Sequence, residues 1–544
     1  MEFDLIVIGG GVNGCGIARD AAMRGVKTLL IERDDFACAA SGNNSQMIHG
    51  GARYLTSDLK TTQLSSIDSG YIQKIAPHLI FRIPFIFPIL KPDHKRSKWR
   101  LALLDAYFRA YDRFGRWKNA KPHLRLSREE ALKLEPDLSP DITGAVTFDE
   151  FGIDSPRLSL LNALSAHEHG ATLKNHTQVL GLILESGAVV GVKVKDLLKG
   201  TCEEYRSKII FNATGPWASK LARLAGVEIK VRPTKGVHIT FEGRFLNTAI
   251  MTQAIDGRTI FIMPHQNTTI LGTTDDDYFG DPGDIPILED EVEYLLEGVE
   301  RVFPRIRQAR MLRAWAGVRP TLYRRGLYED DLSREHWIID HETQDAVAGL
   351  VSVIGGKLAS YRILAEEATD LICQKLSLQA VCHTHEEPLP GGDAALNIEA
   401  LAKLHDLDAL TVERLTFRHG TLAKKVLSLL GVQPSNANRI CQCEPVMAAE
   451  IRYAVRSEFC RSLEDLRRRT RFSIGVCGGN DCVFLAAVIL GEELGWEPLR
   501  VFKEVNLFLQ NKWKETVPVL QGEQLAQSEL ASFMYYGMGC IDQI

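Results

Sequence analysis

The stretch FDLIVIGGGVNGCGIARDAAMRGVKTLLIE, residues 3–32, decides the fold. Its apolar start predicts a buried parallel strand over residues 3–8, followed by a helix over 15–24 and a second strand over 27–31. Gly9, Gly11 and Gly14 lie between the first strand and the helix with G-x-G-x-x-G spacing, and Glu32 closes the second strand. This order of elements is the dinucleotide-binding fingerprint of a Rossmann-like α/β fold.

Each fingerprint residue has a physical task. Gly9 permits a tight turn, Gly11 lets the backbone approach a pyrophosphate, and Gly14 lets helix and strand pack closely. The helix amino terminus faces the pyrophosphate charge, and Glu32 can accept hydrogen bonds from ribose hydroxyls. The fingerprint leaves NAD and FAD both open, although its position at the very start of the chain favours FAD.

Two later segments also predict a strand that ends at a glycine-containing turn. Residues 208–212 predict a strand that leads into Ala213-Thr214-Gly215, and residues 351–354 lead into Gly355-Gly356-Lys357-Leu358 at a helix start. Residues 41–46 form a small polar segment whose Ser41 and Ser45 suit a phosphate and ribitol loop. Turns so far apart in sequence fit one sheet wrapped around one long cofactor.

Composition narrows the class of protein. The chain has 544 residues, enough for two to four domains, and a net charge of −5, which argues against a nucleic-acid-coating protein. It has no apolar run of about 18 residues, and its start lacks the basic region and long apolar core of a signal peptide. A cytoplasmic location follows as an expectation, and there the 11 cysteines need a role other than disulfides.

Four cysteines near the carboxyl end have ligand-like spacing. Cys441 and Cys443 form a C-x-C pair, and Cys477 and Cys482 form a C-x4-C pair. Two close thiolate pairs suit a [2Fe–2S] cluster. Structural zinc and free thiols are the alternatives, although zinc pairs usually have two to four residues between the cysteines.

Seven stretches together carry a family resemblance. The chain resembles the FAD-dependent glycerol-3-phosphate dehydrogenases over about residues 1–380, and its cysteine tail resembles the bacterioferritin-associated-ferredoxin type of [2Fe–2S] domain. With that tail it looks like the catalytic flavin subunit of the anaerobic members of the family. The matching stretches are residues 8–14, 48–55, 212–217, 235–238, 271–275, 316–320 and 355–362.

The resemblance implies a set of site residues. Cations at Arg53, Arg319, Arg334 and Lys357, with Tyr54 beside them, would bind the substrate, and guanidinium groups suit phosphate. His238, with Arg319, is the expected catalytic residue, a neutral imidazole that takes the substrate hydroxyl proton; the alternative is a histidine that orients substrate or satisfies the core. Flavin contacts are expected from His49, Gly50, Thr214, Gly215, Gly356, Lys357 and Leu358, besides the fingerprint residues and Ser41 and Ser45.

The expected architecture is α/β. An amino-acid-oxidase-like FAD-binding domain and an antiparallel-sheet substrate domain are interleaved over residues 1–385, with the substrate cap at about 77–140 and 232–328. A linker and helical segment occupies 386–435, a small helical [2Fe–2S] domain 436–495, and a tail 496–544. Residues 79–90 are apolar and lead into the basic run 91–96, which could rest on a membrane surface, but Pro84 and Pro88 favour a buried strand.

The function implied is oxidation of sn-glycerol 3-phosphate to dihydroxyacetone phosphate. Electrons would pass through the iron–sulfur centre to flavin and iron–sulfur partner subunits of a membrane-bound complex and indirectly to menaquinone, as in anaerobic respiration. The chain would then be peripheral on the cytoplasmic face of the inner membrane, held there by its partners. Two alternatives stay open: an amine or amino-acid oxidase on the same fold, and a non-catalytic flavin and iron–sulfur electron carrier.

Overall fold

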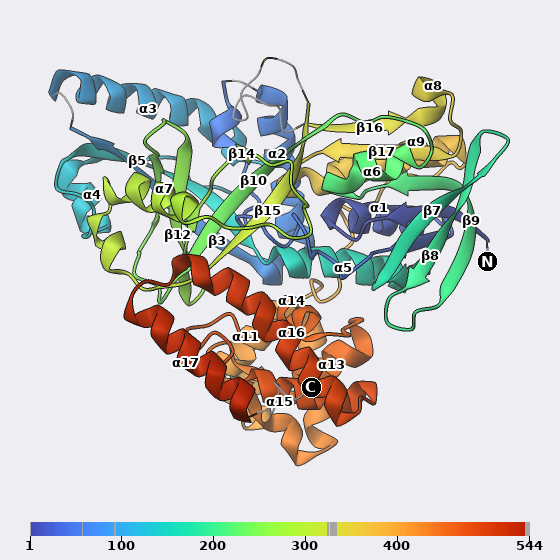
Figure 1. The fold of residues 1–544 in the computed structure, drawn as a ribbon. Helices are drawn as coiled ribbons and strands as arrows, with labels where there is room; N and C mark the ends of the chain where they lie inside the picture. Colours follow the sequence, from blue (N-terminus) through green and yellow to red (C-terminus); the bar gives the residue numbers. More distant parts are fainter. Residues whose placement is uncertain (1, 57, 92–93, 324–325, 327–334, 539–544) are drawn as a thin grey trace.

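The computed structural model describes residues 2–538 except 57, 92–93, 324–325 and 327–334 (Figure 1). The predicted substrate ligand Arg334 therefore lies outside the described residues. Among the described residues, no helix has the length and apolar character needed to cross a bilayer.

The first sheet is built around β1 (Glu2–Ile8), which pairs in parallel with β2 (Thr28–Ile31) on one side and β9 (Cys202–Asn212) on the other. The predicted strand, helix and strand are thus confirmed, with α1 (Val12–Met23) between them. This sheet has the strand order β16-β17-β9-β1-β2-β6, and β8 also pairs with β9. Its other strands are β6 (Thr172–Lys174), β7 (Thr177–Glu185), β8 (Ala188–Asp196), β16 (His336–Asp340) and β17 (Leu350–Gly355).

Helices cover this sheet because its strands are apolar on both faces. Helix α1 packs with α5 (Ser155–Glu168) and α9 (Tyr361–Lys375) on a buried core in which Ala18, Leu161 and Leu364 take part. The three strands that end in glycine turns, β1, β9 and β17, all finish at the same edge of the sheet, since they run parallel. This edge is where α/β proteins bind their ligands.

The second sheet lies beside the first and has the order β14-β10-β13-β12-β11-β3-β5-β4, with β15 on β10. Its pairs are antiparallel apart from β11 with β3, which confirms the mixed α/β class with a largely antiparallel second domain. The sheet extends past the expected boundary at residue 140, since β5 belongs to it. Its strands are β3 (Ile80–Leu90), β4 (Arg125–Ser127), β5 (Ile142–Ile153), β10 (Val231–Phe241), β11 (Ala249–Gln253), β12 (Thr259–His265), β13 (Thr268–Gly272), β14 (Asp276–Asp277) and β15 (Met311–Leu322).

The apolar segment 79–90 is strand β3, as the prolines predicted. It pairs with β5 from Ile80 to Leu90, and Phe85 stacks on Phe148 across that ladder with ring centroids 4.9 Å apart. The strand is followed by helix α3 (His94–Gly115). The other helices of this part of the chain are α2 (Leu59–Ile75), α4 (Arg128–Leu134), α6 (Ala218–Arg223), α7 (Glu289–Glu300) and α8 (His341–Asp345).

The carboxyl-terminal part is a helical unit, drawn in orange and red below the sheets in Figure 1. The segments expected as linker and tail pack with the segment that carries the four cysteines. The supposed linker forms a core with α13, in which Leu415 and Val426 meet Tyr453, and the supposed tail contributes Val505 and Phe508 to the core around α15. The elements are α10 (Ile398–His405), α11 (Ala409–His419), α12 (Ala423–Ser428), β18 (Arg439–Cys441), β19 (Val446–Met447), α13 (Ala448–Ser457), α14 (Leu463–Thr470), α15 (Val483–Leu494), α16 (Pro498–Thr516) and α17 (Glu523–Met538).

Buried ion pairs join the helical unit to the flavin-type domain. Arg157 on α5 contacts Glu458 at 2.8 Å with both side chains buried, and Arg469 on α14 reaches Asp35 just beyond β2. Burial alone would raise the pKa of Glu458, but the charges of Arg157 and His419 outweigh it and hold that pKa at about 2. The helical unit is therefore fixed to the body by charges that are paired inside the protein.

Breaking the Arg157–Glu458 pair is expected to be costly. Arg157→Ala leaves Glu458 buried with one partner fewer, so we expect the free energy of unfolding to fall by about 3–5 kcal/mol. The double replacement Arg157→Met with Glu458→Met removes both charges and should recover most of that loss. Denaturant unfolding measures both, and a single variant as stable as the unaltered chain would contradict the assignment.

The Arg157–Glu458 pair also makes the stability of the folded chain depend on pH. Because the pKa of Glu458 is lower in the folded chain than in the unfolded one, its stabilisation is present at neutral pH and is lost as pH falls from about 4.5 toward about 2. The unaltered chain should therefore lose stability more steeply with acid than the Met double variant does.

Candidate functional site

The glycine turn after β1 has contacts that leave no room for side chains. A Cβ on Gly9, whose φ is +109°, would lie 2.5 Å from the Ala213 carbonyl oxygen, and a Cβ on Gly14 would lie 1.9 Å from the Gly9 carbonyl oxygen. Helix α1 begins at Val12, and the backbone N–H of Val12 donates to Ser41 Oγ at 2.9 Å. The turn is thus shaped for close backbone approach to a ligand at a helix amino terminus.

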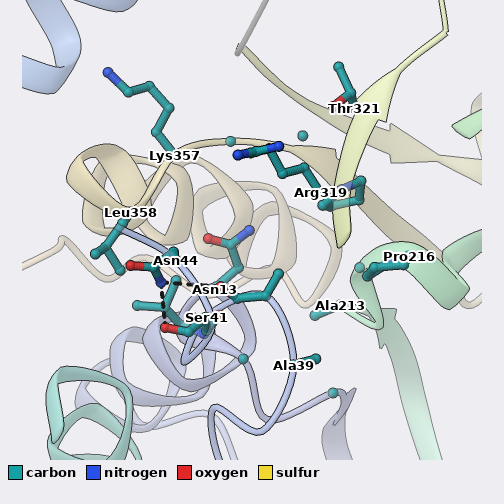
Figure 2. Close-up of a pocket in the computed structure, with 18 of the residues that line it drawn as sticks. Asn13, Ala39, Ser41, Asn44, Ala213, Pro216, Arg319, Thr321, Lys357 and Leu358 are labelled. Atoms are coloured by element: carbon teal, nitrogen blue, oxygen red, sulfur yellow. Dashed lines mark hydrogen bonds between the residues drawn. The ribbon is translucent and has the colours of Figure 1, made fainter. Parts of the chain in front are cut away.

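A cavity of about 590 Å³ opens where the three glycine turns meet the second sheet. Figure 2 shows Ser41, Asn44 and Asn13 together near the glycine turn, and Lys357 and Arg319 farther along the cavity. Predicted site residues that line it are Gly9, Gly11, Glu32, Ser41, Ser45, His49, Arg53, Tyr54, Thr214, Gly215, Arg319, Gly356, Lys357 and Leu358. Gly14, Gly50 and His238 do not line it: Gly14 packs inside the turn, and the other two lie behind the wall.

Glu32 lies at the end of β2, where the fingerprint predicts a ribose ligand. One carboxylate oxygen accepts from the backbone N–H of Gly10 at 2.6 Å and the other from that of Asp34 at 2.9 Å. Burial raises the pKa of Glu32, although these two hydrogen bonds act against the rise. The carboxylate is therefore fixed against the glycine turn and faces the cavity.

Three of the four predicted cations are brought together from distant parts of the chain. Tyr54 contacts two of them, with the Arg53 guanidinium 4.8 Å and the Lys357 ammonium 4.9 Å from its ring centroid. Arg319 on β15 donates from Nη1 to Asp275 Oδ1 at 2.9 Å, and Arg53 approaches the same carboxylate at 3.9 Å. Arg319 belongs to the second sheet, whereas Arg53 lies in the short helical turn of residues 52–54 and Lys357 follows β17 of the first sheet. All three cations line the cavity, so an anionic group of a ligand would be bound there.

Asp275 and Glu150 also line the cavity and were not singled out from the sequence. Asp275 belongs to a stretch that carries the family resemblance, so only its role was missed. Glu150 accepts from the backbone N–H of Gly50 at 3.0 Å and pairs with the buried Lys118 at 2.7 Å. That contact explains how Gly50, although not in the wall, holds the turn that carries His49.

The two candidate histidines differ in position. His238 on β10 is buried, stacks on Trp315 with ring centroids 5.2 Å apart, and its Nε2 lies 2.9 Å from Ser45 Oγ. Burial and the charge of Arg319 lower the pKa of His238 to about 3. His49 lines the cavity itself, and burial and the nearby cations Lys357 and Arg53 lower its pKa well below the usual range. Both imidazoles are neutral at physiological pH, but His238 does not line the cavity and contacts Ser45, which does.

Comparison with known proteins agrees with this geometry. Residues 4–360 match the sequence model of the FAD dependent oxidoreductase family, and residues 382–501 match that of the C-terminal domain of alpha-glycerophosphate oxidase. The chain is 32% identical to the A-type subunit of the anaerobic glycerol-3-phosphate dehydrogenase of Haemophilus influenzae, over 98% of this chain and 93% of that one. The chain belongs to the glycerol-3-phosphate dehydrogenase family of FAD-dependent oxidoreductases.

Two further relatives in this family cover most of the chain. The A1-type subunit of the anaerobic glycerol-3-phosphate dehydrogenase of Haloferax volcanii is 33% identical over 98% of this chain and 89% of that one. The glycerol-3-phosphate dehydrogenase of Bacillus halodurans, solved with FAD, superposes with a TM-score of 0.74 at 26% identity and covers 96% of both chains. The FAD-binding fold and the helical carboxyl-terminal domain are therefore family features, while the ferredoxin-like description of the cysteine segment stays a prediction.

The four carboxyl-terminal cysteines of this family member are close in space. Cys477 and Cys482 shift each other's pKa, Cys441 acts on Cys482, and Cys443 acts on Cys477. The hydrogen bond from Cys482 is the main cause of a lowered pKa at Cys477, and the backbone N–H groups of Gly479 and Asp481 add to it. Four cysteine thiolates are the ligand set of a [2Fe–2S] cluster, and backbone N–H groups stabilise their negative charge.

Glycine and a cation shape the surroundings of these thiols. A Cβ on Gly475 would lie 2.2 Å from Cys443 Cβ, so only glycine fits against that cysteine. Lys512 on α16 donates to Asn480 Oδ1 at 3.0 Å, within the loop that joins Cys477 to Cys482. The donor set and the neighbouring positive charge both fit an anionic metal cluster.

Proposed function

We propose that this protein oxidises sn-glycerol 3-phosphate to dihydroxyacetone phosphate, with FAD in the cavity at the ends of β1, β9 and β17. The observation that carries the proposal is the convergence of Arg53, Arg319 and Lys357 on a cavity whose opposite end is a dinucleotide-binding glycine turn. The relatives named glycerol-3-phosphate dehydrogenase support the choice of substrate.

The cations would bind the substrate phosphate. A phosphate ester carries up to two negative charges, and the two guanidinium groups can donate in a planar fork while the ammonium of Lys357 adds a point charge. Asp275, held by Arg319 at 2.9 Å, keeps that guanidinium oriented. Arg334 is proposed as a further phosphate ligand on the family resemblance alone.

The remaining roles concern the carbon that is oxidised. FAD, when bound, supplies the acceptor for the hydride from C2 of the substrate. The hydroxyl proton has to leave as well, and a neutral histidine at the cavity wall can accept it. Because His49 lines the cavity, we propose it as the direct acceptor, with His238 orienting Ser45 Oγ from behind; this moves the expected base role away from His238.

The two histidines should therefore respond differently to substitution. We expect His49→Asn to lower kcat by about 10²–10³-fold, as loss of a general base does, and His238→Asn to lower it about tenfold or less. Steady-state rates across pH 5–9 test this. Without the base, kcat should rise with pH as hydroxide takes the proton, whereas loss of an orienting group should lower kcat by the same factor at every pH. A larger effect at His238 would return the base role to that residue.

The cysteine site would carry the electrons onward. We propose that Cys441, Cys443, Cys477 and Cys482 bind a [2Fe–2S] cluster, which supplies one-electron chemistry when present. Flavin and iron–sulfur partner subunits of a membrane-bound complex would take the electrons and deliver them to menaquinone in anaerobic respiration, with the chain on the cytoplasmic face of the inner membrane. Partner subunits are supported by the names of the relatives, which describe one subunit of a larger enzyme.

Dye-coupled turnover tests the reaction against its main alternative. The purified full chain should reduce an artificial acceptor with sn-glycerol 3-phosphate and not with glycine. Turnover of glycine alone would favour an amino-acid oxidase, and no turnover of either by the flavin-loaded chain would favour an electron carrier. Iron and acid-labile sulfide assays test the cluster: sulfide with iron supports it, and zinc without sulfide would refute it.

A further inference from the structure

The turn of residues 48–52 carries His49, leads into Arg53, and is held by hydrogen bonds along its backbone. At its centre, the backbone N–H of Gly50 donates to Glu150 Oε2 at 3.0 Å. Hydroxyl groups outside the turn donate to three of its carbonyl oxygens: Ser69 to Ile48 at 2.8 Å, Thr62 to Gly51 at 3.2 Å, and Tyr107 to Ala52. The position of the His49 ring at the cavity therefore depends on side chains from other parts of the chain.

Glu150, on β5, also belongs to a buried ion pair. Its Oε2 lies 2.7 Å from Lys118 Nζ, and the two side chains are 4% and 1% exposed. Its Oε1 accepts from Tyr111 Oη at 2.6 Å, while Lys118 also donates to Tyr111 Oη at 3.0 Å and to the Asp149 carbonyl oxygen at 2.9 Å. Apolar residues of similar volume often replace a buried ion pair without loss of stability, so a role in the fold alone does not account for this one.

The Lys118–Glu150 pair lies directly against the turn. A Cβ on Gly50 would lie 2.6 Å from Tyr111 Oη and 3.3 Å from Lys118 Cδ, so the turn and the pair are in contact. Burial is the largest cause of the low pKa of His49, and three positive charges add to it, those of Lys357, Arg53 and Lys118. The carboxylates on the elements packed around the turn are Glu150 on β5, Asp275 next to Arg53 and Arg319, and Asp68 on α2, which pairs with Arg362.

We propose that Lys118 and Glu150 are a positioning pair for His49. Glu150 fixes the turn that carries the imidazole through the backbone N–H of Gly50, and Lys118 compensates the charge of Glu150, so that the imidazole beside it stays neutral. Lys118 does not line the cavity, so it acts through its neighbours and not on the substrate. The inference rests on the proposed reaction, in which a neutral His49 accepts the hydroxyl proton.

Removing Lys118 alone should allow His49 to take up a proton. In Lys118→Met the carboxylate of Glu150 is uncompensated and favours the imidazolium, so the pKa of His49 should rise to about 6.5 or above. Because only the neutral ring accepts a proton, kcat at pH 6 should then fall by about tenfold relative to kcat at pH 8. Lys118→Met with Glu150→Gln removes both charges and keeps an oxygen that can accept from Gly50, so His49 should again be neutral at both pH values. A purely structural role predicts the opposite order, with the double variant worse than the single one.

NMR of the flavin-loaded full chain with isotope-labelled histidine measures the protonation of His49 itself, without substrate. The His49 signal is identified by its absence from His49→Asn. Arg157→Ala is the matched control, because it breaks another buried ion pair whose members do not line the cavity, and it should leave His49 neutral as in the unaltered chain. If Lys118→Met does not fold, Lys118→Gln takes its place, since its amide can still donate to Glu150 while the charge is absent.

Two results would overturn the proposal. One is a His49 that stays neutral from about pH 5 to 8 in the folded single variant, and the other is a double variant in which His49 takes up its proton at the same pH as in the single one. Because this measurement needs no substrate, a lack of turnover with sn-glycerol 3-phosphate would contradict the proposed reaction and not the effect of the pair on His49. A His49 that titrates as expected while kcat stays constant with pH would contradict its role as the base.

Discussion

Replacing Arg319 with alanine is expected to lower kcat/KM for sn-glycerol 3-phosphate by about 10³-fold. The reason is the loss of a guanidinium that can make two charge-assisted hydrogen bonds to a phosphate, each contributing about 1.5–3 kcal/mol. The change also leaves the Asp275 carboxylate without its contact at 2.9 Å, next to the incoming anion. Dye-coupled rates at varied substrate concentration measure the effect.

Two further variants make this result specific. Arg319→Lys keeps the charge but loses the fork, so its kcat/KM should fall less than that of the alanine variant. Arg310→Ala removes an exposed arginine just before the same strand and should leave kcat/KM unchanged. Equal rates for Arg319→Ala and the unaltered chain would contradict a phosphate role for this residue.

Replacing Cys477 with serine is expected to remove the metal centre while keeping the flavin. A hydroxyl is a poor ligand for iron beside the softer thiolate, and the pKa of Cys477 is lowered chiefly by its neighbour Cys482. Iron and acid-labile sulfide should fall to near background, while flavin content and dye-coupled turnover persist. Transfer to natural electron acceptors should be lost.

The control for this variant is Cys202→Ser, which changes an exposed cysteine on β9 far in sequence from the four. It should keep the full iron and sulfide content. If Cys477→Ser also kept both, the four cysteines would not be the ligands; if it lost flavin as well, the two sites would not be independent.

The cofactor-binding part of the site could be predicted from short stretches of sequence. Gly9, Thr214 and Gly356 each follow an apolar strand, and parallel strands bring their carboxyl ends to one edge, so their meeting at the cavity followed from strand direction. The cysteine pairs were likewise visible as spacing. In both cases the signal lies within a few residues of chain.

The rest of the site could not be predicted in this way, because the positions of its residues depend on strand register and long-range packing. Whether His238 faces the cavity or Trp315 is decided by the pairing of β10 with β15, and a shift of one residue would turn the side chain around. Glu150 became part of the wall only because β5 joins the sheet beyond the expected boundary. The Arg157–Glu458 pair joins residues 301 positions apart, with no local pattern to mark it.

Anaerobic mixing of the purified, flavin-loaded chain with sn-glycerol 3-phosphate tests the proposed function most directly. The absorbance band of oxidised FAD should bleach on mixing, and dihydroxyacetone phosphate should appear in proportion to the flavin reduced. A band that stays unchanged with sn-glycerol 3-phosphate, in a sample that dithionite bleaches fully, would contradict it.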